Sequence, residues 1–178
     1  MQHFLVPYCP YLKHLSASNH MQVTIVSGLF AVCFYLIGSV FQGLNFALDK
    51  DTRSKVFFFG AMAVIAHGIS AYGVIRTTSG FHFGISEIST LITVSISLVV
   101  LISSIRKPLE NLFLGLFPLA VITIIASLTI NSRFPPTVMS AGLASHVLIS
   151  ILAYSFITIA ALQAGFLAYQ NHQLKHGH

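Results

Sequence analysis

The feature that most constrains this chain is a series of five long apolar segments joined by short polar connections. The segments are residues 23–48, 56–75, 84–104, 112–130 and 143–168. A helix that crosses a bilayer needs about 20 mostly apolar residues, and each segment provides roughly that length. None of the connections is long enough for a soluble domain. The sequence therefore predicts an all-α fold, a polytopic membrane bundle of five transmembrane helices within residues 21–170.

The composition supports a membrane protein whose main partner is the lipid bilayer. Hydrophobic residues make up 55% of the chain and charged residues 7%, with a mean hydropathy of +0.83. Soluble domains carry about a quarter charged residues. The net charge of +5 comes from basic residues scattered between the apolar segments, so we interpret them as topology signals and expect no nucleic-acid partner. The two cysteines, Cys9 and Cys33, are far apart and form no disulfide or zinc pattern.

Lys and Arg are unevenly distributed between the two sides that alternating helices create. One side carries six of them and the other carries three: Lys50, Arg53, Lys55, Arg106, Lys107 and Lys175 against Lys13, Arg76 and Arg133. The positive-inside rule places the richer side in the cytoplasm. We therefore expect the N-terminus outside, the C-terminus inside and a cytoplasmic tail at residues 171–178. Residues 1–20 are either a short outer tail or, if Met21 is the true start, a misannotated stretch.

Two histidines lie inside predicted helices, where an ionisable side chain is a functional candidate by default. His67 is in the second segment and His146 is near the start of the fifth, and the predicted topology places both in the outer half of the membrane. Imidazole is a common metal ligand, and two histidines on different helices suit the axial positions of a haem better than a zinc or di-iron site. The alternative is that each histidine only hydrogen-bonds a neighbouring helix.

Other polar residues in the predicted helices admit two interpretations. Glu87 lies at the start of the third segment, where a carboxylate favours the helix dipole, although a ligand role is also open. A polar stripe continues along that helix and could line a cavity or bond to adjacent helices: Ser86, Thr90, Thr93 and Ser97. Tyr154 follows His146 on one face of the fifth helix. No nucleophile, metalloprotease or phosphate-binding motif is present, so we do not expect an enzyme.

The sequence Leu143-Ala-Ser-His146-Val-Leu-Ile-Ser150-Ile-Leu-Ala-Tyr154-Ser155-Phe resembles the histidine-bearing helix of the cytochrome c assembly protein family. That family comprises haem-handling membrane proteins of the CcsA and CcmC type. The chain is most similar to its YpjD-like, or HemX-like, inner-membrane branch. Ala66-His67-Gly68, residues 83–91 with Glu87, and residues 115–120 also resemble parts of that branch.

The resemblance implies haem handling or cytochrome c maturation in a bacterial plasma membrane, with other maturation proteins as partners. It also implies a haem-iron ligand at His146 and a second one at His67, with Glu87 and Tyr154 near the cofactor. The family's Trp-rich haem-contact motif is missing, because the chain has no Trp. Family members continue with further helices, so the resemblance implies that this chain is shortened at its C-terminus. The alternative functions are a membrane scaffold that binds no haem and, as a weaker alternative, a small transporter.

Overall fold

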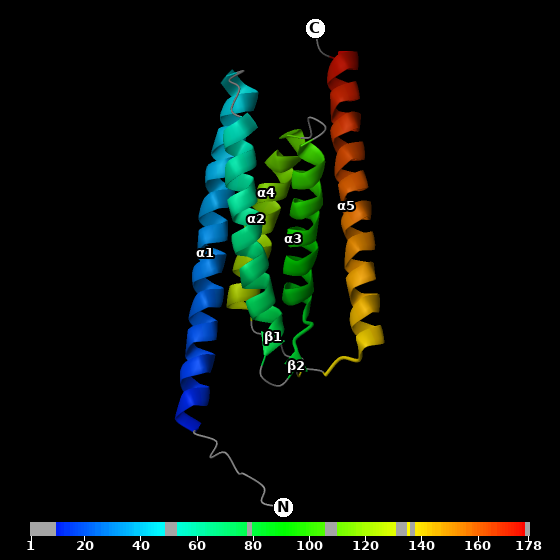
Figure 1. The fold of residues 1–178 in the computed structure, drawn as a ribbon. Helices are drawn as coiled ribbons and strands as arrows, with labels where there is room; N and C mark the ends of the chain where they lie inside the picture. Colours follow the sequence, from blue (N-terminus) through cyan, green and yellow to red (C-terminus); the bar gives the residue numbers. More distant parts are fainter. Residues whose placement is uncertain are drawn as a thin grey trace, which may run out of the picture.

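The computed structural model describes residues 10–48, 53–77, 80–105, 110–130, 135 and 138–176. Five long helices run alternately up and down: α1 (Pro10–Leu48), α2 (Arg53–Ile75), α3 (Ile85–Ser104), α4 (Glu110–Thr129) and α5 (Ala141–His176) (Figure 1). All five are long and apolar enough to cross a membrane. The predicted all-α bundle of five membrane helices is therefore confirmed, and the chain is a multi-pass membrane protein.

The helices at the two ends of the chain are longer than the sequence analysis expected. α1 begins at Pro10, well before residue 23, and the expected outer tail is partly helical. Proline is tolerated in the first turn of a helix because its missing N–H has no helical partner there, and no further proline or glycine interrupts the chain until Gly28. α5 continues to His176, through the segment expected to be a polar tail, because its last residues include good helix formers.

A short β-hairpin forms part of the polar connection between α2 and α3. Strands β1 (Arg76–Thr77) and β2 (Gly80–Phe81) pair antiparallel, with Arg76 opposite Phe81. Gly80 has a φ of 139°, a conformation that residues with a side chain rarely adopt. The hairpin lies at the end of the bundle where α5 begins (Figure 1).

Helices α1 to α4 form the core, and α5 packs beside them. α1 packs against α2 and α4, whereas α5 packs mainly against α3. The largest completely buried side chains include Tyr35, Phe113 and Phe117, whose rings contact one another in the centre of the core. Only 11% of the apolar window of α5 is buried, compared with 44% for α4, so α5 presents most of its surface outward.

Small residues allow α1 and α2 to approach closely. A Cβ atom at Gly73 would lie 2.0 Å from the Thr24 Oγ1 atom, and one at Gly28 would lie 2.8 Å from the Ser70 Oγ atom. The Ser70 hydroxyl also donates to the Thr24 carbonyl at 3.0 Å. Such contacts are typical of membrane helices, where close backbone packing replaces the hydrophobic driving force that water provides elsewhere.

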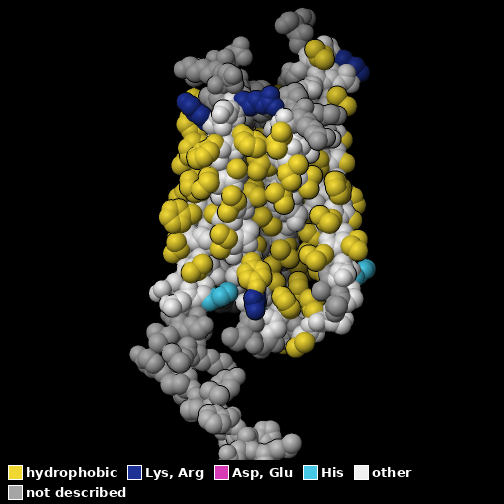
Figure 2. Space-filling model, viewed as in Figure 1, with side chains coloured by type: hydrophobic (Ala, Val, Ile, Leu, Met, Phe, Trp, Pro, Cys, Tyr) yellow, Lys and Arg dark blue, Asp and Glu magenta, His cyan; other side chains and the backbone are white. Residues whose placement is uncertain are grey.

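The outer surface is mostly hydrophobic between the two ends of the bundle, and most of the Lys and Arg side chains visible in Figure 2 gather at its upper end. The start of α2 and the end of α5 contribute Arg53, Lys55 and Lys175 to that end, whereas Arg76 lies at the opposite end with the hairpin. Lys50, Arg106, Lys107 and Arg133 lie outside the described residues.

Candidate functional site

His67 lies completely buried on α2, in the middle of the four-helix core. Its Nδ1 atom lies 3.2 Å from the Tyr35 hydroxyl of α1, and its Nε2 atom lies 2.8 Å from the Thr90 hydroxyl of α3. Neutral imidazole has one donor and one acceptor nitrogen, and a hydroxyl can take either role, so both nitrogens are satisfied in either tautomer. His67 therefore connects three helices, and neither of its ring nitrogens is left for a metal ion.

His146 has a different environment. It lies on an exposed part of α5, in the second turn of the helix. Within the described part of the chain, its ring has no hydrogen-bond partner. Its imidazole is therefore open to a ligand from outside the bundle, unlike that of His67.

The expected haem site between these two histidines does not fit this arrangement. His67 is enclosed by α1, α2 and α3, with protein hydroxyls on both ring nitrogens. His146 lies on the outer side of a helix that packs mainly against α3. For both residues to ligate one haem, His67 would have to give up a hydrogen bond to Tyr35 or Thr90, and α5 would have to pack differently against the other helices. The geometry leaves His146 as the candidate ligand and gives His67 a structural role.

The other two expected cofactor residues are not brought to either histidine by any described contact. Glu87 is 4% exposed in the first turn of α3, and its Oε2 atom accepts a hydrogen bond of 3.0 Å from the Ser86 hydroxyl. Tyr154 is 59% exposed, and its ring lies on the outer surface of α5. His146 and Tyr154 share that helix, two turns apart.

Two residues of the polar stripe of α3 connect helices, and none of the four lines the cavity described below. Thr90 contacts His67, and the Thr93 hydroxyl lies 2.8 Å from that of Thr123 on α4. Ser97 is also buried, and its hydroxyl lies near the Tyr35 hydroxyl of α1 without a hydrogen bond of standard geometry. The stripe was expected either to line a cavity or to bond to adjacent helices. Thr90 and Thr93 bond to adjacent helices.

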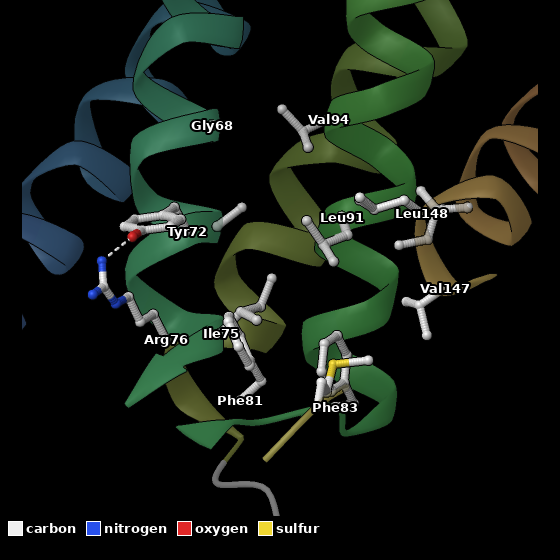
Figure 3. Close-up of a pocket in the computed structure, with 13 residues that line it drawn as sticks. Gly68, Tyr72, Ile75, Arg76, Phe81, Phe83, Leu91, Val94, Val147 and Leu148 are labelled. Atoms are coloured by element: carbon white, nitrogen blue, oxygen red, sulfur yellow. Dashed lines mark hydrogen bonds between the residues drawn. The ribbon is translucent and has the colours of Figure 1, made fainter. Parts of the chain in front are cut away.

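A cavity that sequence reasoning missed lies between α2, α3 and the start of α5. Its volume is about 310 Å³, and Figure 3 shows side chains from the three helices and the hairpin pointing into it. Its walls are almost entirely apolar: Gly68, Ala71, Ile75, Phe81, Phe83, Leu91, Val94, Met139, Val147, Leu148 and Ile151. Neither His67 nor His146 lines it. Because each helix contributes only ordinary apolar residues, no local sequence signal marks this cavity.

Two polar side chains border the cavity, Tyr72 of α2 midway along it and Arg76 at the start of the hairpin. The Arg76 guanidinium donates a hydrogen bond to the Tyr72 hydroxyl and lies 5.5 Å from the centre of the Tyr72 ring (Figure 3). A cation held above an aromatic ring gains roughly 0.5–1 kcal/mol at an exposed site. Arg76 makes no ion pair with any side chain that the structure describes, so its charge remains available to an anion.

Comparison with protein-family models, with curated proteins and with solved structures finds no match to this chain. What is established about the chain is therefore its fold, which is that of a multi-pass helical membrane protein.

Proposed function

We propose that this chain is a non-enzymatic protein of a bacterial plasma membrane that handles haem during cytochrome c assembly, with His146 as its haem-iron ligand. The observation that carries the proposal is the contrast between the two intramembrane histidines. The ring of His146 is exposed and has no described partner, whereas both nitrogens of His67 contact protein hydroxyls. The resemblance of the segment around His146 to a haem-handling family supports the same residue.

A single histidine can serve as the protein ligand of haem iron, and His146 would have that role here. Haem would supply the iron centre, and this chain would supply the imidazole from a position near one end of α5. Handing haem from one protein to another requires an accessible ligand, which His146 provides.

The proposal is tested by an absorption spectrum of the detergent-purified protein loaded with haemin. The wild-type protein should give a Soret band shifted from that of haemin in detergent, and His146→Ala should lose the shift. His172→Ala removes an exposed histidine from the far end of the same helix and is the matched control, which should behave like the wild type. Identical spectra for the wild-type protein and for haemin in detergent alone would overturn the proposal.

One observation favours a second candidate function, a membrane scaffold that binds no haem. α5 is only 11% buried along its apolar window, which leaves most of that helix available to the helices of another membrane protein. A scaffold would recover a protein partner on affinity purification, without pigment. It would also show the same spectrum with and without His146.

A further inference from the structure

We propose that the cavity between α2, α3 and α5 binds one acyl chain of an anionic phospholipid, whose phosphate contacts the guanidinium of Arg76. The proposal is independent of haem binding, because neither His67 nor His146 lines the cavity. It depends on the shape and lining of the cavity, on the charge at its end and on the position of that end in the bundle.

The lining of the cavity matches a hydrocarbon chain. Apart from Tyr72 and Arg76, the lining side chains offer no hydroxyl, amide or charged group to a polar ligand. The volume of about 310 Å³ is at the lower end of the range of roughly 300–1,000 Å³ that is usual for small-molecule sites. The cavity extends along α2 from Gly68 to Arg76, a rise of about 12 Å for eight residues of helix. A void of this shape suits a slender apolar chain.

Arg76 supplies the group that would select an anionic head. It follows the last residue of α2, so it lies where a spanning helix ends and the lipid headgroups begin. Arg76 and Tyr72 both border the cavity, and the Tyr72 hydroxyl and ring hold the guanidinium on the flank of α2 that faces away from α3 (Figure 3). A guanidinium can form two parallel, charge-assisted hydrogen bonds with phosphate oxygens. Its hydrogen bond to the neutral Tyr72 hydroxyl is weaker and leaves its charge uncompensated.

The hairpin and α5 give the cavity an opening toward the bilayer. The hairpin brings Phe81 and Phe83 to one end of the cavity, and α5 contributes Val147, Leu148 and Ile151 to one side. Among the described residues, side chains of α2, α3 and α5 surround this space without filling it. In a membrane a hydrocarbon chain would occupy it more favourably than water, which finds few polar partners there.

The test uses the absence of Trp from the chain, which makes an introduced Trp the sole indole fluorophore. The full-length protein with Phe83→Trp is reconstituted in phosphatidylcholine vesicles that contain a minor fraction of phospholipid with brominated acyl chains, which quench Trp on contact. The brominated lipid is phosphatidylglycerol in one sample and phosphatidylcholine in the other. Phe156→Trp is the matched control, because Phe156 is 59% exposed near the middle of α5, away from the basic residues at both ends of the bundle.

We expect brominated phosphatidylglycerol to be enriched about fivefold around Trp at position 83, which corresponds to about 1 kcal/mol of attraction for one basic side chain near the membrane surface. Trp at position 156 should show no preference. Arg76→Gln should abolish the preference at position 83. Arg76→Lys, whose helical content is checked by circular dichroism, should retain part of it because the charge remains.

Three results would overturn the proposal. The first is equal quenching by the two brominated lipids at position 83, and the second is a preference that survives Arg76→Gln. The third is loss of the preference when inorganic phosphate or haemin is added, since the site would then serve a free anion or a porphyrin. Unchanged quenching in the presence of either compound supports a lipid site.

Discussion

The Tyr35 hydroxyl of α1 lies 3.2 Å from Nδ1 of His67 of α2, and the two rings meet edge to face at a centroid distance of 5.8 Å. Both side chains are completely buried. With Thr90 on the other ring nitrogen, they form a polar connection through three helices inside an apolar core. Polar contacts of this kind fix which faces of membrane helices meet, because apolar packing alone discriminates weakly among them.

Removing one partner of this connection should destabilise the bundle. Tyr35→Phe keeps the ring but leaves Nδ1 of His67 buried without a partner, which should cost about 1–3 kcal/mol of unfolding free energy. The measurement is unfolding of the detergent-solubilised protein by increasing sodium dodecyl sulfate. Tyr154→Phe is the control, because Tyr154 is 59% exposed, and it should change the unfolding free energy by less than about 0.5 kcal/mol. Equal effects of the two substitutions would contradict the structural role of His67.

Two substitutions in the polar stripe of α3 should have different effects. Thr90→Val removes the partner of His67 Nε2 and should lower the unfolding free energy by about 1 kcal/mol. Ser97→Ala removes a buried hydroxyl that lies near Tyr35 without a hydrogen bond of standard geometry, so the unfolding free energy should change little. Comparing the two variants in the same unfolding assay separates hydrogen bonding from loss of volume. A large loss for Ser97→Ala would show that this hydroxyl is bonded after all.

The close contact between α1 and α2 predicts a steric effect. Gly73→Ala would place its methyl group 2.0 Å from the Thr24 Oγ1 atom, so the two helices must separate or Thr24 must rotate. Overpacking of this kind costs about 1–3 kcal/mol. Gly115→Ala is the matched control, because nothing lies within 4 Å of the added carbon. The double variant Thr24→Ala with Gly73→Ala should recover part of the loss, and failure to recover any would place the cause elsewhere.

The distribution of basic residues predicts the orientation of the bundle. In a background without the native cysteines, Val138→Cys at the hairpin end should react with a membrane-impermeant maleimide in intact cells. Leu174→Cys at the opposite end should react only after permeabilisation. These positions are 87% and 84% exposed, so a lack of reaction reflects the side of the membrane and not burial. The reverse pattern would place the N-terminus in the cytoplasm.

Five apolar segments are sufficient to predict five membrane helices, because only internally bonded helices and closed barrels satisfy the backbone in lipid. The functional details were harder to predict. Tyr35 lies in a continuous apolar run, so nothing in the sequence identifies it as the partner of His67. Sequence periodicity assigns a residue to one face of its helix but does not say which neighbouring helix that face contacts. Whether a histidine nitrogen is available to iron depends on the side chain that the neighbouring helix places beside it. The cavity was also unpredictable, because it arises from the spacing of three helices.

The weak packing of α5 has a mechanical consequence. Helices α1 to α4 are cross-linked by buried hydroxyls and an imidazole, whereas α5 lies beside them and packs mainly against α3. A force applied at the C-terminus would therefore extract α5 first, in a low-force event distinct from the rupture of the remaining four helices. The last helix is thus the element that can exchange protein neighbours without disrupting the rest of the molecule.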